Sequence, residues 1–187
     1  IGFDDFSRMI HATRIFLEGP YRNGNMAADL ATKSLVPSVP PNIYPYSLDP
    51  NRNSYYLRNV PDSVVDWVVL EFRTKQIGGE TKYVTGLLLK NGQLMDVNMN
   101  SPMYLSKRFL TDDEYYIVVR HRNHLSVVTE NPVRMAANTT ITELDFSKPG
   151  VLFGHTDAVK PLAKQIDNTI IYGMISGDVN SDGKIDD

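Results

Sequence analysis

The chain contains no cysteine, so disulfide bonds cannot stabilise it. Its 187 residues are nevertheless enough for one domain that buries about two-thirds of its unfolded surface, and a domain of this size does not need such bonds. The absence of cysteine does not identify a compartment by itself, because many exported bacterial proteins of this size also lack cystine.

The chain also lacks a basic excess and long apolar runs. Its net charge is -3 at pH 7, and its Lys and Arg residues are scattered except around Arg120 to Arg122. The longest apolar runs, such as VVDWVVLEF and YYIVV, are far shorter than the roughly 20 residues needed to span a bilayer. We therefore expect no nucleic-acid partner and no membrane span.

Common enzyme signatures are missing: the chain has no GxGxxG, P-loop, GxSxG or HExxH motif. The densest group of titratable residues is Arg120 to His124. His121 and His124 could form a metal pair, but three residues along a strand place them on opposite faces unless a turn redirects one. The alternative is a polar hairpin end, and we expect no catalytic residue in the chain.

Runs of β-branched and aromatic residues between turn residues predict an all-β fold, an immunoglobulin-like or jelly-roll-like antiparallel β-sandwich. Asn91-Gly92 predicts a hairpin, because both residues readily adopt positive φ. A second hairpin is expected at His121 to His124. The candidate strands are 12–18, 26–31, 64–73, 82–90, 93–98, 115–121, 125–129, 140–146 and 168–175.

Segment 64–73, VVDWVVLEFR, is apolar on both faces of the expected strand. Alternation places one set on each face: Val65, Trp67 and Val69 on one, and Val64, Val68, Leu70 and Phe72 on the other. The segment 36–56 is rich in proline and tyrosine, which predicts an extended, ordered loop. Either this loop or another protein chain covers the second face, and the loop is favoured because large bare apolar patches are rare on soluble monomers. Asp66, inside the strand, is interpreted as a hydrogen-bonded structural carboxylate rather than a general base.

Four tyrosines in this loop are candidate ligand-binding residues, because exposed aromatic rings stack on sugar rings. They are Tyr44, Tyr46, Tyr55 and Tyr56. The same side chains could instead hold the loop in place or form a subunit contact, and the sequence leaves both alternatives open.

The C-terminal segment GDVNSDGKIDD has the spacing of an EF-hand-type calcium loop. The expected Ca2+ ligands are Asp178, Asn180, Asp182, the Lys184 carbonyl and Asp186. Gly183 occupies the sixth position, where a sharp turn is required, and Ile185 is expected to anchor the loop to a core. The twelfth position, which normally supplies a bidentate carboxylate, lies past Asp187, so we expect weak binding unless a neighbouring chain adds an oxygen. The alternative is a merely acidic tail.

The C-terminal segment resembles the first calcium loop of a type I dockerin. The stretches FLEGPYRNGNMAADL, VPDSVVDWVVLEFR, GLLLKNGQLMDV, YYIVVRHRNHLSVV and YGMISGDVNSDGKIDD resemble a domain that precedes such loops in exported proteins of Bacteroidetes and related phyla, often labelled haemagglutinin or dockerin-containing protein. The resemblance implies an exported, non-enzymatic β-sandwich. A dockerin has two such loops and binds a cohesin, whereas this chain holds one incomplete loop.

These observations predict three parts: an N-terminal arm (1–11), a β-sandwich (12–176) and a truncated dockerin-like calcium loop (177–187). The chain begins IGFDDF, as a mature product does after signal-peptide removal, so we expect an extracellular or cell-surface location. Ser63, in an Asp-Ser-apolar signal, and Asn138, in an Asn-Thr-Thr sequon, are candidate glycosylation sites.

The function favoured by the sequence is a self-associating structural module, such as the subunit of a surface fibre or sheath. The arm would add a strand to a neighbouring copy, and the calcium loop would stabilise the joint. The alternatives are a carbohydrate-binding or adhesion module that uses the tyrosine loop, an enzyme accessory domain that uses His121 and His124, and docking to a cohesin-like domain.

Overall fold

The computed structural model describes residues 8–10, 13–105, 109–136, 140–141, 144–178, 180 and 182–185. Over these residues β strands are the main regular structure, with predominantly antiparallel pairing and a single short α helix, α1 (Asp29–Thr32). The all-β prediction is confirmed at this level. None of the helices in the described part of the chain is long and apolar enough to cross a bilayer.

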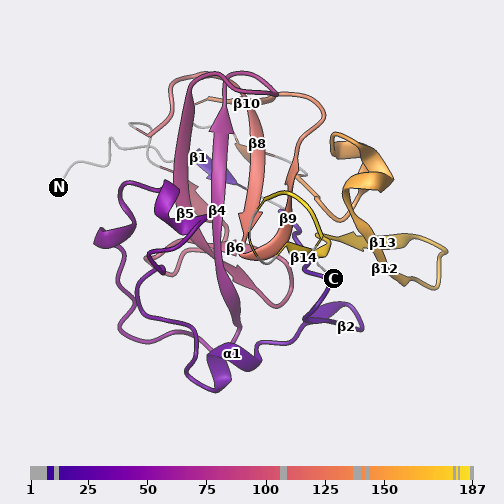
Figure 1. Cartoon of the computed structure of the whole chain (residues 1–187), viewed down its shortest axis with the longest axis horizontal. Coiled ribbons are helices and arrows are strands. Elements are labelled where there is room, and N and C mark those ends of the chain that lie inside the picture. The colour runs from indigo at the N-terminus through magenta and orange to yellow at the C-terminus, as the bar shows by residue number, and fades with distance from the viewer. Residues whose placement is uncertain are drawn as a thin grey trace.

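The largest sheet has the strand order β14-β9-β8-β4-β5-β6, with β10 paired to β8, and Figure 1 shows β4 and β8 at its centre. Each pairing in it is antiparallel. The bounds are β4 (Val64–Arg73), β5 (Thr81–Leu89), β6 (Leu94–Met95), β8 (Asp113–His121), β9 (Asn123–Val128), β10 (Val133–Met135) and β14 (Ser176–Asp178).

Smaller sheets surround this one. Strand β1 (Arg8–Ile10) lies between β11 (Thr140–Ile141), which is parallel to it, and β7 (Met103–Leu105), which is antiparallel. Residues 8–10, which the sequence analysis assigned to an arm, therefore pair within the chain. The remaining pairs are β2 (Tyr21–Arg22) with β3 (Asn25–Met26), and β12 (Lys160–Lys164) with β13 (Ile170–Gly173). Short 3-10 turns are η1 (Tyr46–Leu48), η2 (Arg52–Ser54), η3 (Pro149–Val151) and η4 (His155–Ala158).

Strand β4 is buried along almost its whole length and separates two hydrophobic clusters. On one face, Val68, Leu70 and Phe72 join a cluster that includes Met103 and Leu105 of β7. On the other face, Trp67 and Val69 pack with residues that precede the strand in the sequence, among them Val36, Tyr46 and Leu57. This is why the segment is apolar at nearly every position, as expected for a strand that is covered on both sides.

The first residues of β4 do not follow the alternation that the sequence predicted. Val65 lies in the cluster with Val68, and Val64 lies in the cluster with Trp67, so the predicted faces of these two valines were wrong. The reason is a register shift between Val64 and Asp66 in the pairing with β5. A bulge of this kind inserts one residue and exchanges the two faces of the strand on one side of it.

The Pro/Tyr segment covers the second face of the sheet, so the prediction of intramolecular cover is confirmed. The Tyr46 hydroxyl donates a hydrogen bond to the Trp67 carbonyl at 3.0 Å, and the Trp67 indole Nε1 donates to the Pro37 carbonyl at 2.9 Å. The Asp49 carboxylate accepts a hydrogen bond from the Thr85 amide of β5 at 2.7 Å. These buried contacts fix a loop that contains little regular structure.

Two predicted strands were wrong. Segment 26–31 ends β3 and begins α1. In segment 12–18, whose described part begins at Thr13, Arg14 and Leu17 form isolated bridges, because the backbone bonds to several different segments in turn. Segment 93–98 is shortened to β6, since the Asp96 carboxylate accepts the amides of Asn98 and Asn100 and curls the chain.

The hairpin at Asn91-Gly92 is confirmed as the connection between β5 and β6. Only Gly92 has positive φ, at 85°, so the turn differs from the predicted one with both residues in that region. A Cβ at Gly92 would also lie 3.1 Å from the Ile15 carbonyl oxygen. Both the backbone conformation and the close packing therefore require glycine here.

The hydroxyl bond of Tyr46 gives a direct test of the loop cover. Replacing Tyr46 with Phe removes a hydrogen bond in a site shielded from water, so the free energy of unfolding should fall by about 1–3 kcal/mol in urea titrations. Tyr56→Phe is the matched control: Tyr56 is 67% exposed, and its substitution should change stability by less than about 0.5 kcal/mol. Equal effects of the two substitutions would contradict this account of the cover.

Candidate functional site

The turn between β8 and β9 brings His121 and His124 together. Arg122 and Asn123 make a tight turn, with Asn123 at φ 66°, and the Cα atoms of His121 and His124 are direct cross-strand partners. Their rings stand edge to face with centroids 4.8 Å apart, and their Nδ1 atoms are separated by 2.9 Å. The expected hairpin therefore forms, and it is the exception to opposite faces that the sequence allowed, because residues that flank a two-residue turn face each other across the hairpin.

Asp66 meets this turn from β4, next to the register shift. Its Oδ1 accepts a hydrogen bond from the Trp67 amide at 2.8 Å. Its Oδ2 accepts from Arg122 Nε at 3.0 Å and Nη2 at 2.8 Å, and lies 3.3 Å from His121 Nε2. The carboxylate is almost fully buried, and its bonds agree with the interpretation of Asp66 as a hydrogen-bonded carboxylate.

These partners assign the protons of the two imidazole rings. The Arg122 carbonyl, 3.4 Å from His124 Nδ1, can only accept a hydrogen bond, so His124 Nδ1 carries the proton. His121 Nδ1 must then accept from His124, and the His121 proton lies on Nε2, where it is donated to Asp66. The chain Asp66–His121–His124 therefore leaves His124 Nε2 with a free lone pair.

His124 Nε2 is buried and has no hydrogen-bond partner among the described residues. Burial, followed by the neighbouring His121, lowers the pKa of His124 to about 4, so the ring is neutral at pH 7. For Asp66, burial alone raises the pKa, but the hydrogen bond from His121 and the Arg122 charge outweigh it, and the pKa lies below its ordinary value. The corner of the sheet formed by Asp66 and the β8–β9 turn thus holds the ionised carboxylate of Asp66 and the neutral imidazole of His124.

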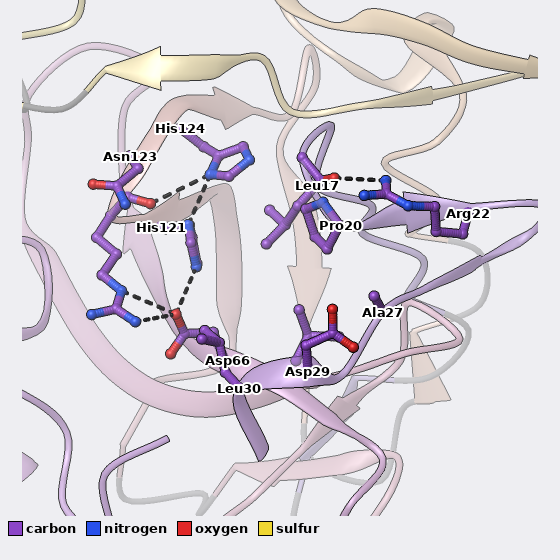
Figure 2. Close-up of a pocket in the computed structure, with 13 residues that line it drawn as sticks. Leu17, Pro20, Arg22, Ala27, Asp29, Leu30, Asp66, His121, Asn123 and His124 are labelled. Atoms are coloured by element: carbon purple, nitrogen blue, oxygen red, sulfur yellow. Dashed lines mark hydrogen bonds and ion pairs between the residues drawn. The ribbon is translucent and has the colours of Figure 1, made fainter. Parts of the chain in front are cut away.

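A pocket of about 340 Å³ lies beside the three hydrogen-bonded side chains of Asp66, His121 and His124. Figure 2 shows His121, His124 and Asp66 on one side of it and Leu17, Pro20 and Ala27 on the other. The opposite wall comes from the segment that carries β2, β3 and α1. The pocket therefore joins three parts of the sequence that are far apart: residues 17–30, the start of β4 and the β8–β9 turn.

The sequence pointed to His121 and His124 but missed their link to Asp66 and the pocket. Two signals could have suggested it: a polar pair between two apolar strands, with Asn in a position that tolerates positive φ, and a lone carboxylate in an otherwise apolar strand. The register shift that directs Asp66 toward the turn has no comparable signature in the sequence.

The start of the predicted calcium loop lies at the same corner. Strand β14 pairs with β9, with Ser176 opposite His124 and Asp178 opposite Asn123, and the register shifts between Ser176 and Asp178. Glu18 fastens this strand, because its carboxylate accepts hydrogen bonds from the Ser176 amide at 2.9 Å and hydroxyl at 3.0 Å. Asp178 is only 6% exposed, and its Oδ1 has no hydrogen-bond partner within the described part of the chain.

The described residues of this segment fit a hard cation in their donor atoms and turn. Gly183 has φ 82°, as the sharp turn at the sixth position requires. The Asn180 side chain accepts the Asp182 amide at 3.0 Å, and Asp182 accepts the Lys184 amide at 2.9 Å, which curls the backbone. In the described ranges, no three His, Cys, Asp or Glu side chains form a group that could hold a metal. Asp186 lies outside those ranges.

One expectation about this segment was wrong. Ile185 is 54% exposed and does not anchor the loop to the core. Unlike Asp178, it follows the last strand, so no sheet pairing draws it inward.

The four candidate tyrosines have different surroundings. Tyr46 is fully buried, and Tyr44 accepts a hydrogen bond from Arg120 Nη1 at 2.6 Å. Burial, with Asp49 beside it, raises the pKa of the half-buried Tyr55 hydroxyl. Tyr56 is the most exposed of the four. The loop-fixing role that the sequence left open thus applies to Tyr44, Tyr46 and Tyr55. Of the glycosylation candidates, Ser63 is half-buried just before β4, and Asn138 lies outside the described residues.

Comparisons of the chain with protein-family models, with curated proteins and with solved structures found no match. The resemblance to domains that precede dockerin loops therefore stays a prediction. The function has to be inferred from the residues described above.

The lowered pKa of His124 predicts a specific acid sensitivity. The unfolded chain binds a proton at this residue below about pH 6.5 and the folded chain only below about pH 4, so stability is lost as pH falls through this window. The loss attributable to His124 is on the order of 3 kcal/mol. Urea titrations between pH 7 and pH 4 should show a shallower loss for His124→Gln than for the unsubstituted chain. The control is His155→Gln, an exposed histidine on η4, which should keep the pH dependence of the unsubstituted chain. If the free energy of unfolding of His124→Gln falls with pH as steeply as that of the unsubstituted chain, the lowered pKa of His124 is contradicted.

Proposed function

We propose that the chain is a non-catalytic structural module of the cell exterior, that it associates with copies of itself, and that its C-terminal segment binds Ca2+. The observation that carries the proposal is the Asp178 carboxylate, buried at the first position of the DxNxDG segment, with one oxygen that has no hydrogen-bond partner among the residues that the structure describes. Burying an unpaired carboxylate oxygen is costly, and a cation offsets that cost.

The position of this segment supports a role at a joint between subunits. Strand β14 forms one edge of the largest sheet, and the described residues after it, 180 and 182–185, are exposed. The Ca2+ ligands would be Asp178, Asn180, Asp182, the Lys184 carbonyl and Asp186. A second copy packed against this segment would give the exposed Ile185 an apolar partner.

The β12–β13 ribbon is a second feature that supports self-association. It lies at one side of the molecule in Figure 1 and forms a separate two-stranded sheet. Ile166, in the turn between its strands, is fully exposed. Ile171 of β13 packs into the main hydrophobic cluster, and strand edges that lack a partner are templates for another strand. Strand addition from a second copy would extend the ribbon and cover Ile166.

The finer architecture belongs to the same proposal. We infer an immunoglobulin-like or jelly-roll-like sandwich in which the largest sheet packs against the β11-β1-β7 sheet, followed by an EF-hand-like loop. The shared cluster between Phe72 of β4 and Met103 of β7 supports this arrangement. An extracellular or surface location suits such a module, because millimolar calcium occupies weak sites there.

A carbohydrate-binding or adhesion module is the second candidate. Tyr56, with 67% of its surface exposed, is the observation that favours it. The remaining tyrosines of the loop hold it against the sheet, so a stacking surface on this loop would centre on Tyr56.

Calcium binding is tested by thermal unfolding in millimolar calcium and in chelator. Calcium should raise the melting temperature by a few degrees, because a ligand that binds the folded state stabilises it by mass action. Asp178→Asn and Asp182→Asn should each remove this rise. Asp182 is exposed, so its substitution remains informative if the buried Asp178 variant folds poorly. The control is Asp157→Asn, an exposed carboxylate on η4, which should leave the rise unchanged.

Self-association is tested by sedimentation of the purified chain over a concentration series, with calcium and with chelator. The proposal predicts species larger than a monomer that shrink when calcium is removed. It also predicts that Ile166→Lys weakens assembly without changing the melting temperature of the monomer. A monomer at all concentrations in both conditions would rule out the self-association proposal.

A further inference from the structure

The pocket beside His124 has two unlike walls. One is apolar and comes from Leu17, Pro20, Ala27, Leu30 and Val65. The other is polar and consists of Asp66 and residues 121–124. This combination of an apolar surface with a few fixed polar groups is typical of small-molecule sites.

The polar wall presents an acceptor rather than a charge. Asp66 and Arg122 form an ion pair, so their charges offset each other. At the rim, the Arg22 guanidinium donates to the Gly19 and Tyr21 carbonyls, and the exposed Asp29 carries the opposite charge. The pocket therefore has no net charge that would select an ion, and a neutral ligand fits it best.

His124 Nε2 is the acceptor. The ring is 7% exposed, and the hydrogen bonds of Nδ1 to His121 and to the Arg122 carbonyl fix the proton on that side. In Figure 2 the nitrogen without a dashed line points away from His121, toward the side of the pocket where Leu17 and Pro20 lie. A buried acceptor without a partner costs about 1–3 kcal/mol, so such an atom requires an explanation.

The size of the pocket limits the ligand. Its volume of about 340 Å³ is near the lower end of the range for small-molecule sites. It can take one six-membered ring with substituents but not an extended chain. Because Nε2 has almost no exposed surface, a hydroxyl group reaches it only when the pocket wall shifts.

We propose that this pocket binds a small neutral ring compound that carries a hydroxyl group, of which a single pyranoside is the natural example. The hydroxyl donates a hydrogen bond to His124 Nε2, and a C–H face of the ring packs against Leu17, Pro20 and Leu30. His124 is held in the accepting tautomer by His121, which is held in turn by Asp66. The site requires neither bound calcium nor the tyrosine loop.

The test is an NMR titration of the full chain with methyl glucoside, methyl galactoside, methyl mannoside and cyclohexanol. At least one probe should shift the amide resonances of residues 17–30 and 121–124 in a saturable manner. The His124 Nε2 nitrogen resonance should move upfield, as it does when a bare imidazole nitrogen accepts a hydrogen bond. Cyclohexanone, which has the ring but no hydroxyl donor, should bind at least tenfold more weakly than cyclohexanol.

Two substitutions locate the binding. His124→Phe keeps an aromatic ring but removes the acceptor, and should weaken the best probe at least tenfold. Ala27→Leu fills the pocket and should abolish binding. It leaves the hydrogen bonds that link Asp66, His121 and His124 intact. Its control is Ala28→Leu, the same change at the neighbouring position, which does not line the pocket and should bind like the unsubstituted chain.

The proposal is overturned if no probe shifts these resonances, if Ala27→Leu binds as well as the unsubstituted chain, or if cyclohexanone and cyclohexanol bind equally. If His124→Phe fails to fold, two comparisons still test whether the pocket binds the ligand: Ala27→Leu against Ala28→Leu, and cyclohexanone against cyclohexanol. Because calcium is absent from these titrations, failure here would leave the calcium proposal standing, and the reverse also holds.

Discussion

The register shift between Val64 and Asp66 is the constraint on which the arrangement of the candidate site depends. It exchanges the two faces of β4, so that Val64 and Trp67 share one cluster and Val65 and Val68 share the other. It also lies directly beside the carboxylate that meets the β8–β9 turn. Bulges commonly redirect a side chain in this way. Similar shifts occur between Val119 and His121 and between Ser176 and Asp178, so irregular pairing is concentrated at this corner of the sheet.

The energetics of the corner explain why its members depend on one another. A buried carboxylate is tolerated only when its charge is paired and its oxygens are hydrogen-bonded, and Arg122, His121 and the Trp67 amide meet both needs of Asp66. A well-packed apolar replacement of such a group is often no less stable, so stability alone does not account for it. What the carboxylate adds is orientation: it sets the proton position of His121, and through it that of His124.

The sequence predicted the features that follow from local patterns. The limits of β4 match because a short apolar run rich in valine and aromatic residues favours a buried strand, and the Asn91-Gly92 hairpin follows from the backbone freedom of Gly92. The intramolecular cover was expected from the apolar second face of β4. Such features depend on neighbouring residues or on simple alternation.

The rest depended on contacts between distant segments. Segment 12–18 has the composition of a strand, but its amides bond to partners near Gly92, Leu144 and Met174, an arrangement with no periodicity to detect. The roles of His121 and His124 depend on a two-residue turn and on Asp66, which is 55 residues away from His121. A pattern confined to one segment cannot reveal such a site.

The hydrogen bonds from Asp66 through His121 hold His124 as a neutral ring whose Nε2 has no partner in the described part of the chain. A long-range proton–nitrogen correlation spectrum of the histidine side chains at neutral pH reports which nitrogen of each ring carries the proton. It should show a proton on Nε2 in His121 and on Nδ1 in His124, and Asp66→Asn should disturb both patterns. A spectrum in which His124 carries its proton on Nε2, or in which either ring of the pair is doubly protonated, would contradict this proton assignment.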